Sequence, residues 1–408
     1  MTREVARSHY DAIVGLDPRR REAPAFAFAL VKVTYQIKDS TAVLTKPEPL
    51  LHDFWSDDKL EPRFPPGSDF WLTKPAADVV VRGAAFAPHG RPTASTFASV
   101  QIGNAFKRIA VFGKRMVEWR NGRPTFGRPE PFTEMPLLYQ NAYGGLDNRV
   151  PIPSDILDQY MQLATNGMQY DHPGLYPRNP VGKGYLVLPD PLEGVELPNL
   201  EDPSDLLTPE RLITQKPELW YRQPLPWCFE WTNGCTFPRY QFVGVDAWFP
   251  APDGATLPEV QRGYFPADLR RTLPKNALET EAFYQEASLG MVFKAPLAGQ
   301  PVVVTGMHPE ETSLNFIMPP DPSIKIEVEG EQSVVPSLLT GLVIYPAERK
   351  FYAVYCGKTK GLKRPFIPGI HRNIPISASI NGDTPIRYES PPTIRERLAA
   401  ANAGQAGK

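Results

Sequence analysis

The sequence predicts a mainly β protein in which two antiparallel, sandwich-like lobes flank a helical and loop-rich middle insertion, an α+β arrangement. Near both ends of the chain, apolar and polar residues alternate with the period of a strand. Signals for longer helices concentrate between about residues 150 and 290. The 47 prolines and 30 glycines punctuate these segments without forming a repeat, which indicates many turns and irregular loops.

Four regions follow from this pattern. We expect an N-terminal antiparallel β lobe at 1–150, a loop-rich and helical middle region at 151–290, a C-terminal antiparallel β lobe at 291–388 and a short helical tail at 389–408.

The stretch 74–88 is expected to form the central strand of the fold. Pro75 and Pro88 bracket a β-branched run, and proline suits strand ends because it cannot donate a ladder hydrogen bond. Gly83 interrupts the run, which indicates a bulge or a close approach of another backbone. A valine at Gly83 is therefore expected either to overpack the site, at ~1–3 kcal/mol, or to force a disfavoured φ.

Further strands are predicted on either side of this stretch. Residues 26–37 alternate as a half-buried strand and turn through Asp39-Ser40 into a partner at 41–45. Residues 99–103 and 106–112 form a hairpin, and Asn121-Gly122 marks another turn. In the last third of the chain, the predicted strands are 301–305, 314–318, 324–328, 337–345 and 350–356, with a hairpin turn at 346–348.

The middle region carries the helical signals. Ser154 caps a short helix, residues 257–288 are expected to be helical in two pieces, and a capping box at Thr393 opens the C-terminal helix. The aromatic segment 220–248 has two interpretations: a core packed against the central strands, or an exposed Trp/Tyr/Arg surface typical of protein interfaces.

Composition excludes several classes of partner. The net charge of −1 gives no electrostatic basis for binding nucleic acid. No apolar run approaches the ~18 residues of a transmembrane helix, and the N-terminus lacks the apolar centre of a signal peptide. Three cysteines cannot all pair, which favours a reducing cytoplasm.

No catalytic or metal-binding pattern is complete. Gly357-Lys358-Thr359 lacks the upstream glycine of a phosphate-binding loop. His308 stands near two glutamates but has no second histidine at ligand spacing. Cys228 and Cys235 are seven residues apart in apolar surroundings, as expected for buried, inert thiols. We therefore expect a protein that is not an enzyme, with no cofactor and no metal.

Six ordered blocks of sequence resemble a known family. The first runs from Lys74 through Pro75, Asp78 and Gly83 to Pro88, and the others are 111–115, 135–145 with Gly144-Gly145, 179–185, 197–201 and Pro238-Arg239. In this order they resemble the bacterial type VI secretion effector-adaptor family, long known only as a domain of unknown function. The resemblance implies a cytoplasmic chaperone that binds a toxin effector and loads it onto the spike protein of the secretion system. It implies no catalytic residues.

Three of these blocks supply the candidate partner-binding residues. The loops 139–145, 179–185 and 197–201 each combine glycine or proline with asparagine and an aromatic or apolar side chain, and are expected to converge on one side of the N-terminal lobe. The candidates are Tyr139, Asn141, Tyr143, Asn179, Lys183, Tyr185, Asn199 and Glu201. Two roles remain open: exposed side chains that contact the spike, or side chains that only brace one another.

A second functional class is also compatible with the sequence. The many tryptophans and tyrosines fit a carbohydrate-binding or carbohydrate-modifying β protein. A cleft with paired carboxylates at glycosidase spacing would favour that class, and a flat aromatic patch without such a pair would favour the adaptor.

Overall fold

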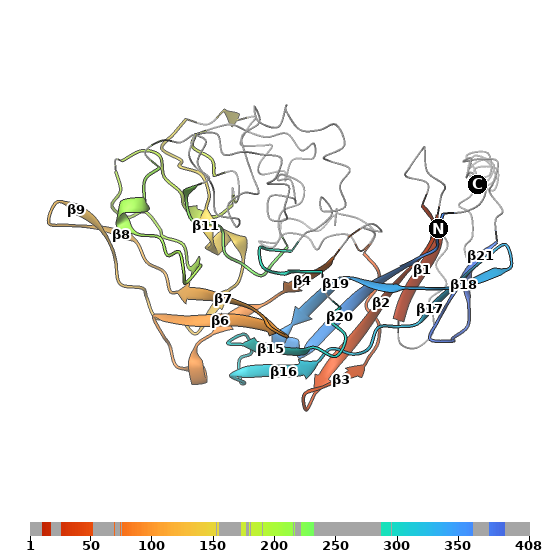
Figure 1. The fold of residues 1–408 in the computed structure, drawn as a ribbon. Helices are drawn as coiled ribbons and strands as arrows, with labels where there is room; N and C mark the ends of the chain where they lie inside the picture. The colour runs from red at the N-terminus through yellow and green to blue at the C-terminus, as the bar shows by residue number, and fades with distance from the viewer. Residues whose placement is uncertain are drawn as a thin grey trace, which may run out of the picture.

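A computed structural model gives the fold of the chain (Figure 1). It describes residues 10–17, 26–51, 69, 74, 76–151, 153–154, 173–176, 179, 181–189, 191–214, 216, 222–231, 287–294, 296–361 and 375–387.

The largest sheet has seven strands drawn from both ends of the chain. Its order is β1-β2-β20-β19-β4-β14, with β3 paired to β2. The strands are β1 (Tyr10–Asp17), β2 (Phe26–Lys38), β3 (Thr41–Leu44), β4 (Ala77–Val81), β14 (Val292–Phe293), β19 (Ser337–Tyr345) and β20 (Lys350–Lys358). All pairs are antiparallel except β4 with β19, which run parallel.

A second sheet has five strands in the order β13-β7-β6-β15-β16. They are β6 (Ser95–Ile102), β7 (Ala105–Phe112), β13 (Leu200–Glu201), β15 (Pro301–Thr305) and β16 (Ser313–Ile317). The ring of Phe351 stacks on Phe316 of this sheet at 4.6 Å and on Tyr35 of its own sheet at 4.9 Å. These rings join the two sheets into one core.

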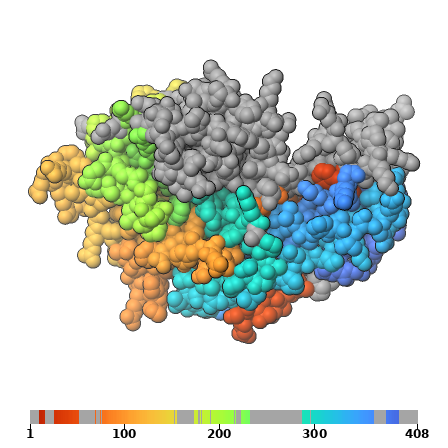
Figure 2. Space-filling view, in the orientation of Figure 1, coloured from red at the N-terminus to blue at the C-terminus, as the bar shows by residue number. Residues whose placement is uncertain are grey.

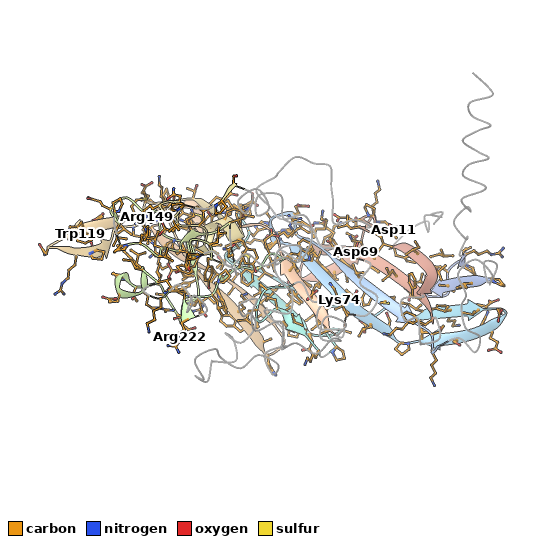
Figure 3. All side chains as sticks on the ribbon, turned by 90° about the horizontal axis from the view of Figure 1, so that it is seen from above. Asp11, Asp69, Lys74, Trp119, Arg149 and Arg222 are labelled. Carbon is orange, nitrogen blue, oxygen red and sulfur yellow. The ribbon has the colours of Figure 1, made fainter. Side chains whose placement is uncertain are left out.

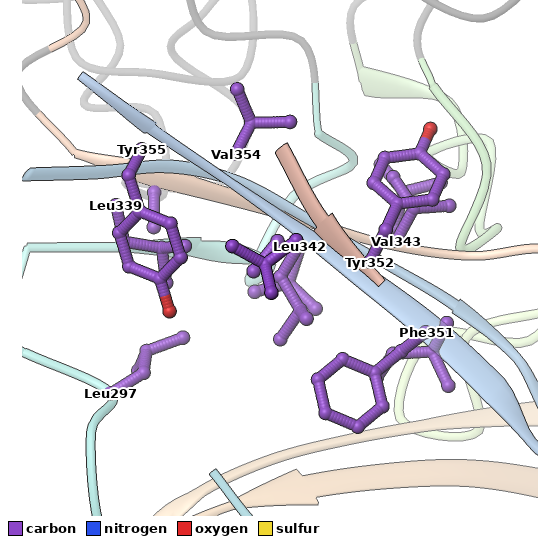
Figure 4. Close-up of a cluster of buried hydrophobic side chains, with 14 of the residues drawn as sticks. Leu297, Leu339, Leu342, Val343, Phe351, Tyr352, Val354 and Tyr355 are labelled. Atoms are coloured by element: carbon purple, nitrogen blue, oxygen red, sulfur yellow. The ribbon is translucent and has the colours of Figure 1, made fainter. Parts of the chain in front are cut away.

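The seven-stranded sheet is apolar on both faces. Phe351 and Tyr355 of β20 point to one side, and Tyr352 and Val354 point to the other (Figure 4). All four side chains are buried. The strand predicted at 26–37 is likewise buried on both faces rather than half-buried, because Lys32 lies over the Tyr352 ring and reaches Asp69 at 3.0 Å.

Smaller sheets complete the described part. A four-stranded sheet has the order β18-β17-β21-β22, and three ribbons pair β10 with β5, β11 with β12, and β8 with β9. These strands are β5 (Ala84–Phe86), β8 (Val117–Arg120), β9 (Arg123–Phe126), β10 (Glu134–Pro136), β11 (Tyr143–Gly144), β12 (Lys183–Gly184), β17 (Ile324–Val328), β18 (Glu331–Val335), β21 (Ile376–Ile380) and β22 (Ile386–Arg387). Short 3-10 turns occur at η1 (Pro88–Gly90), η2 (Tyr139–Asn141), η3 (Pro209–Arg211) and η10 (Pro346–Glu348).

The mainly β prediction is confirmed, and several predicted strands have the expected bounds. Residues 301–305, 324–328 and 337–345 are strands with the predicted ends, and η10 forms the predicted turn between β19 and β20. The helices predicted at 257–288, except for residues 287 and 288, and in the C-terminal tail lie outside the described residues, as do Trp220 and Trp248. Of the aromatic segment, the described Phe229 and Trp231 are buried in the core.

The ranges predicted as N- and C-terminal lobes contribute strands to the same two sheets. β2 lies beside β20, and β6 lies beside β15. The surface shows the same arrangement, with the orange residues near 100 directly beside the teal residues near 300 (Figure 2).

The expectation of a crowded Gly83 was wrong. The run 77–86 is split between sheets, because β4 joins the large sheet and β5 pairs with β10. Gly83 lies at the bend between them, and a Cβ atom there would meet only Pro346 Cδ, at an ordinary 3.8 Å. The glycine marks a change of sheet and not a close backbone approach.

Candidate functional site

Five of the six resembling blocks meet in one place, which we call the motif junction: residues 83–86, 111–115, 135–145, 179–185 and 197–201, as far as these are described. The junction begins where β10 pairs with β5, and the Leu137 N–H donates to the Gly83 oxygen at 3.1 Å. The sixth block, Pro238-Arg239, lies outside the described residues.

Asn179 binds two parts of the junction through its side chain. Its Nδ2 donates to the backbone oxygens of Tyr139 at 2.8 Å and Tyr143 at 3.0 Å. Its own backbone oxygen accepts from the Gly145 N–H at 2.7 Å. The backbone segments at Gly144 and Asn179 come so close that a Cβ on Gly144 would lie 2.2 Å from the Asn179 backbone oxygen. Gly144 also has a φ of +144°. Only glycine fits there.

Asn199 likewise connects blocks of the junction through its backbone and its side chain. Its N–H donates to the Asn141 oxygen at 2.8 Å, and its Nδ2 donates to the Phe112 oxygen at 3.0 Å. Its Oδ1 accepts from Lys183 Nζ at 2.9 Å, and the same ammonium group lies 2.7 Å from Glu196. One asparagine therefore connects three blocks of the junction to its own.

Arg115 and Glu201 form a buried ion pair within the junction. Arg115 also donates to the Pro198 oxygen at 3.1 Å, and Glu201 accepts from the Leu207 N–H at 2.7 Å. Burial raises the pKa of Glu201, although the Arg115 charge and these hydrogen bonds oppose that effect. Both charges are thus desolvated, and removing one partner would leave the other uncompensated.

Three tyrosines, two of them from the junction itself, pack against one another. The Tyr143 ring meets Tyr176 edge-on at 5.2 Å and Tyr185 edge-on at 6.4 Å. The hydroxyl of Tyr176 donates to the Pro224 oxygen at 2.8 Å, and that of Tyr185 donates to the Pro173 oxygen at 3.2 Å. The cluster is therefore a packed, hydrogen-bonded core.

Asp147 fixes the chain where it leaves the junction. Its carboxylate accepts from Arg149 Nε and Nη2, both at 2.7 Å, and from the N–H groups of Val187 at 2.9 Å and Leu188 at 3.1 Å. Burial alone would raise the pKa of Asp147, but these hydrogen bonds outweigh it and lower the pKa.

The three predicted loops converge, as the parallel pairing of β11 with β12 and the bridge from Ala142 to Leu200 show. The side chains expected to be exposed are mostly internal. Six of the eight candidates are buried: Tyr139, Tyr143, Asn179, Tyr185, Asn199 and Glu201. Asn141 is partly exposed, and Lys183 is 23% exposed. The tyrosines are buried because their rings supply the apolar volume that loops rich in glycine and proline lack.

The first block carries a second buried polar cluster, on the large sheet. Lys74 Nζ lies 2.7 Å from Asp78 Oδ2, and Asp78 Oδ1 accepts from the Ala287 N–H at 3.1 Å. Both charged side chains and Asp69 line a cavity of about 20 Å³, room for about one water molecule. Figure 3 shows Asp69 and Lys74 over the large sheet. Pro75 lies outside the described residues, and Pro88 begins η1.

Lys107 is a buried residue that the sequence analysis missed. Its Nζ donates to the Cys228 oxygen at 2.7 Å, Ser288 Oγ at 2.8 Å and the Leu289 oxygen at 2.7 Å. Burial lowers its pKa to about 7. The alternation of β7 places Lys107 among its inward-facing apolar residues. A charged residue at a position expected to be apolar was the sequence signal that could have identified it.

The Nδ1 atom of His308 accepts hydrogen bonds from the N–H groups of Glu310 at 3.2 Å and Glu311 at 3.1 Å. Within the described ranges, no three His, Cys, Asp or Glu side chains are grouped so as to hold a metal ion. Cys228 and Cys356 are both buried. None of the helices in the described part of the chain combines the length and hydropathy needed to cross a bilayer.

Residues 23–355 match a family described as an uncharacterized protein conserved in bacteria (DUF2169). The match includes every block of the motif junction. No curated protein and no solved structure matches this chain.

Proposed function

The chain belongs to this bacterial family of uncharacterised proteins, DUF2169, and from that premise we propose that it is a cytoplasmic adaptor of type VI secretion. In this role it binds a toxin effector and loads it onto the spike protein. It performs no catalysis itself.

One observation carries the proposal: five sequence blocks that resemble the adaptor family form a single connected network. Asn179 connects the blocks at 139–145 and 179–185, and Asn199 connects 111–115, 139–145 and 179–185 to its own. The polar groups of these blocks bond to one another and to the backbone, which supports a role as a scaffold. A scaffold of this kind suits an adaptor, since a pre-organised surface loses little entropy on binding.

The exposed rim of the junction is the part we assign to the spike. Lys183 and Glu196 are both partly exposed, and their ion pair at 2.7 Å lies over Asn199. Asn141 is also partly exposed. The buried tyrosines position this rim from beneath. We assign the effector to the C-terminal range 291–388, so that one surface varies with the cargo while the other stays constant.

The experiment measures binding of the purified chain to its spike and to its effector separately. A Lys183→Glu variant reverses the charge on the rim, and Lys46→Glu reverses an exposed lysine outside the junction. We expect Lys183→Glu to weaken spike binding by about tenfold or more, as for a charged contact whose partner is left unpaired. Effector binding should stay unchanged, and Lys46→Glu should bind both partners normally.

The opposite results are equally clear. Loss of effector binding alone would reverse the assignment of the two surfaces. If the folded wild-type chain binds neither protein, the adaptor proposal fails. Binding or hydrolysis of a glycan by the same protein, abolished by a single substitution, would instead establish the carbohydrate class.

A further inference from the structure

The outer face of the five-stranded sheet carries large apolar side chains that are exposed. Ala98 and Val100 of β6 point inward and are buried, so Phe97 points outward. The register of β6 with β7 places Phe106 and Arg108 on the same outer face as Phe97. Phe97 is 52% exposed and Phe106 is 55% exposed. Such aromatic side chains are enriched where protein surfaces meet.

Arg108 is held between these two rings. Its guanidinium lies 5.2 Å from the centre of the Phe97 ring and 5.2 Å from that of Phe106. Cation–π attraction therefore fixes a positive charge on an apolar surface. Arg108 is exposed and forms no ion pair within the described part of the chain. We call Phe97, Phe106 and Arg108 the outer-face cluster.

The backbone beneath the cluster is held on both sides. The Trp227 indole donates to the Arg108 oxygen at 2.6 Å. The neighbouring Lys107 points inward and forms three hydrogen bonds, to Cys228, Ser288 and Leu289. The cluster is thus ordered before any partner arrives, which lowers the entropic cost of binding.

Arg108 gives the outer face of the five-stranded sheet a positive charge. Its exposed and partly exposed neighbours are neutral: Ser99, Gln101, Val303, Thr305, Asn315 and Ile317. Glu201 of β13 shares the face at its far end, but it is buried in its ion pair with Arg115. A complementary surface therefore supplies a carboxylate for Arg108 and apolar groups for the two rings.

We propose that the outer-face cluster is a docking site for a protein segment that presents an aspartate or glutamate flanked by apolar side chains. A planar guanidinium binds a carboxylate bidentately, and the rings exclude water around that contact. Nucleic acid is disfavoured as the partner, because a single cation neutralises too little of a phosphate backbone. The site shares no residue with the motif junction rim and does not depend on the adaptor assignment.

A library of random linear peptides, panned on the full-length chain, tests this site. Peptides are first depleted on an Arg108→Gln variant, and the enriched consensus is synthesised for fluorescence polarisation. We expect a consensus with an acidic residue next to apolar ones. Its affinity should fall by about tenfold or more in Arg108→Gln, in Phe97→Ser, or when the acid of the peptide becomes its amide.

Two controls keep the result specific. Trp119→Ser removes another half-exposed aromatic, on the β8–β9 ribbon at the far end of the molecule (Figure 3), and should leave peptide affinity unchanged. Thermal melts of all variants should match the wild type, because the altered side chains are exposed.

Several outcomes would overturn the proposal. These are failure to enrich any peptide over the depleted pool, a consensus without an acid, and peptide affinity that ignores Arg108→Gln. Light scattering that shows the wild type self-associating through Arg108 would assign the face to a second copy of the chain. Binding of a single-stranded oligonucleotide that requires Arg108 would assign it to nucleic acid.

Discussion

The side-chain nitrogen of Asn179 lies 2.8 Å from the backbone oxygen of Tyr139, a contact between residues 40 positions apart in the chain. The same nitrogen reaches the oxygen of Tyr143 at 3.0 Å, so one amide satisfies two buried carbonyls of the motif junction. Buried backbone acceptors need such partners, because water cannot replace them.

An Asn179→Asp substitution tests this contact at nearly constant shape. It replaces the donor nitrogen by an oxygen and brings like partial charges together. The Tyr143 carbonyl then loses its donor, whereas the Tyr139 carbonyl keeps the Ala142 N–H at 3.1 Å. We expect the free energy of unfolding to fall by about 1–3 kcal/mol, the cost of one unsatisfied buried group. Urea denaturation measures the change, and the exposed Asn315→Asp is the control. Equal stability of the two variants would contradict the bracing role.

Glycine positions give a second prediction. Gly144→Ala should destabilise the protein by about 3 kcal/mol or more, because its Cβ would lie 2.2 Å from the Asn179 oxygen at a φ of +144°. Gly83→Ala should change stability by less than about 1 kcal/mol, because its Cβ would have ordinary contacts. Thermal melts of the two variants measure this difference. A larger loss of stability in Gly83→Ala than in Gly144→Ala would show that the backbone of the junction adjusts to a Cβ more readily than the bend at Gly83.

Asp147 predicts a component of acid unfolding. Its pKa is lowered in the folded protein, so its contribution to stability is present above the unfolded pKa of ~3.9 and is lost as the pH falls through the folded pKa. Asp147→Asn should remove this component and lower the free energy of unfolding at pH 7 by about 2–3 kcal/mol, because the partly exposed Arg149 loses its buried charge partner.

The measurement for Asp147 is a series of denaturant titrations between pH 7 and pH 3. The wild type and the variant should converge in stability toward acid pH. Glu193→Gln, at an exposed site, serves as the control. A constant difference between wild type and Asp147→Asn across this range would mean that the carboxylate charge contributes nothing.

Cys228 should be unreactive in the folded protein. Burial raises the pKa of its thiol to about 12, and the reactive form of cysteine is the thiolate. Iodoacetamide at pH 8 should therefore leave Cys228 unmodified in native protein and modify it fully in denaturant. Peptide mass spectrometry distinguishes it from Cys235. Rapid native labelling of Cys228 would show that the segment carrying it opens frequently.

Local signals predicted the hairpins well because a tight turn depends on the types of a few consecutive residues. Asp39-Ser40 and Asn121-Gly122 all adopt positive φ between paired strands, a conformation that Asp, Asn and Gly favour. The strand at 331–335 was missed because its exposed residues, three of them polar, do not alternate with apolar ones. The strand at 10–17 was missed because it mixes Asp11 and Gly15 into an apolar run.

The candidate site was predicted less completely, for a different physical reason. The convergence of the three loops could be predicted from the residue types that they share. The direction of each side chain depends on contacts across tens of residues, such as Asn199 with Phe112, and no local pattern specifies them. Tyrosines at an interface and tyrosines in a core look alike in sequence, because both use an apolar ring with one polar end.

The parallel pairing of β4 with β19 joins Val79 to Leu342, and thus the first quarter of the chain to its last. During synthesis, β2, β4 and β6 leave the ribosome long before their later partners β20, β19 and β15, so neither large sheet closes until strands from the last third of the chain are made. Until then their backbone edges stay open to pairing with other chains. A nascent chain or a C-terminal truncation of this protein is therefore prone to aggregation, and its folding depends on the last strands to be made.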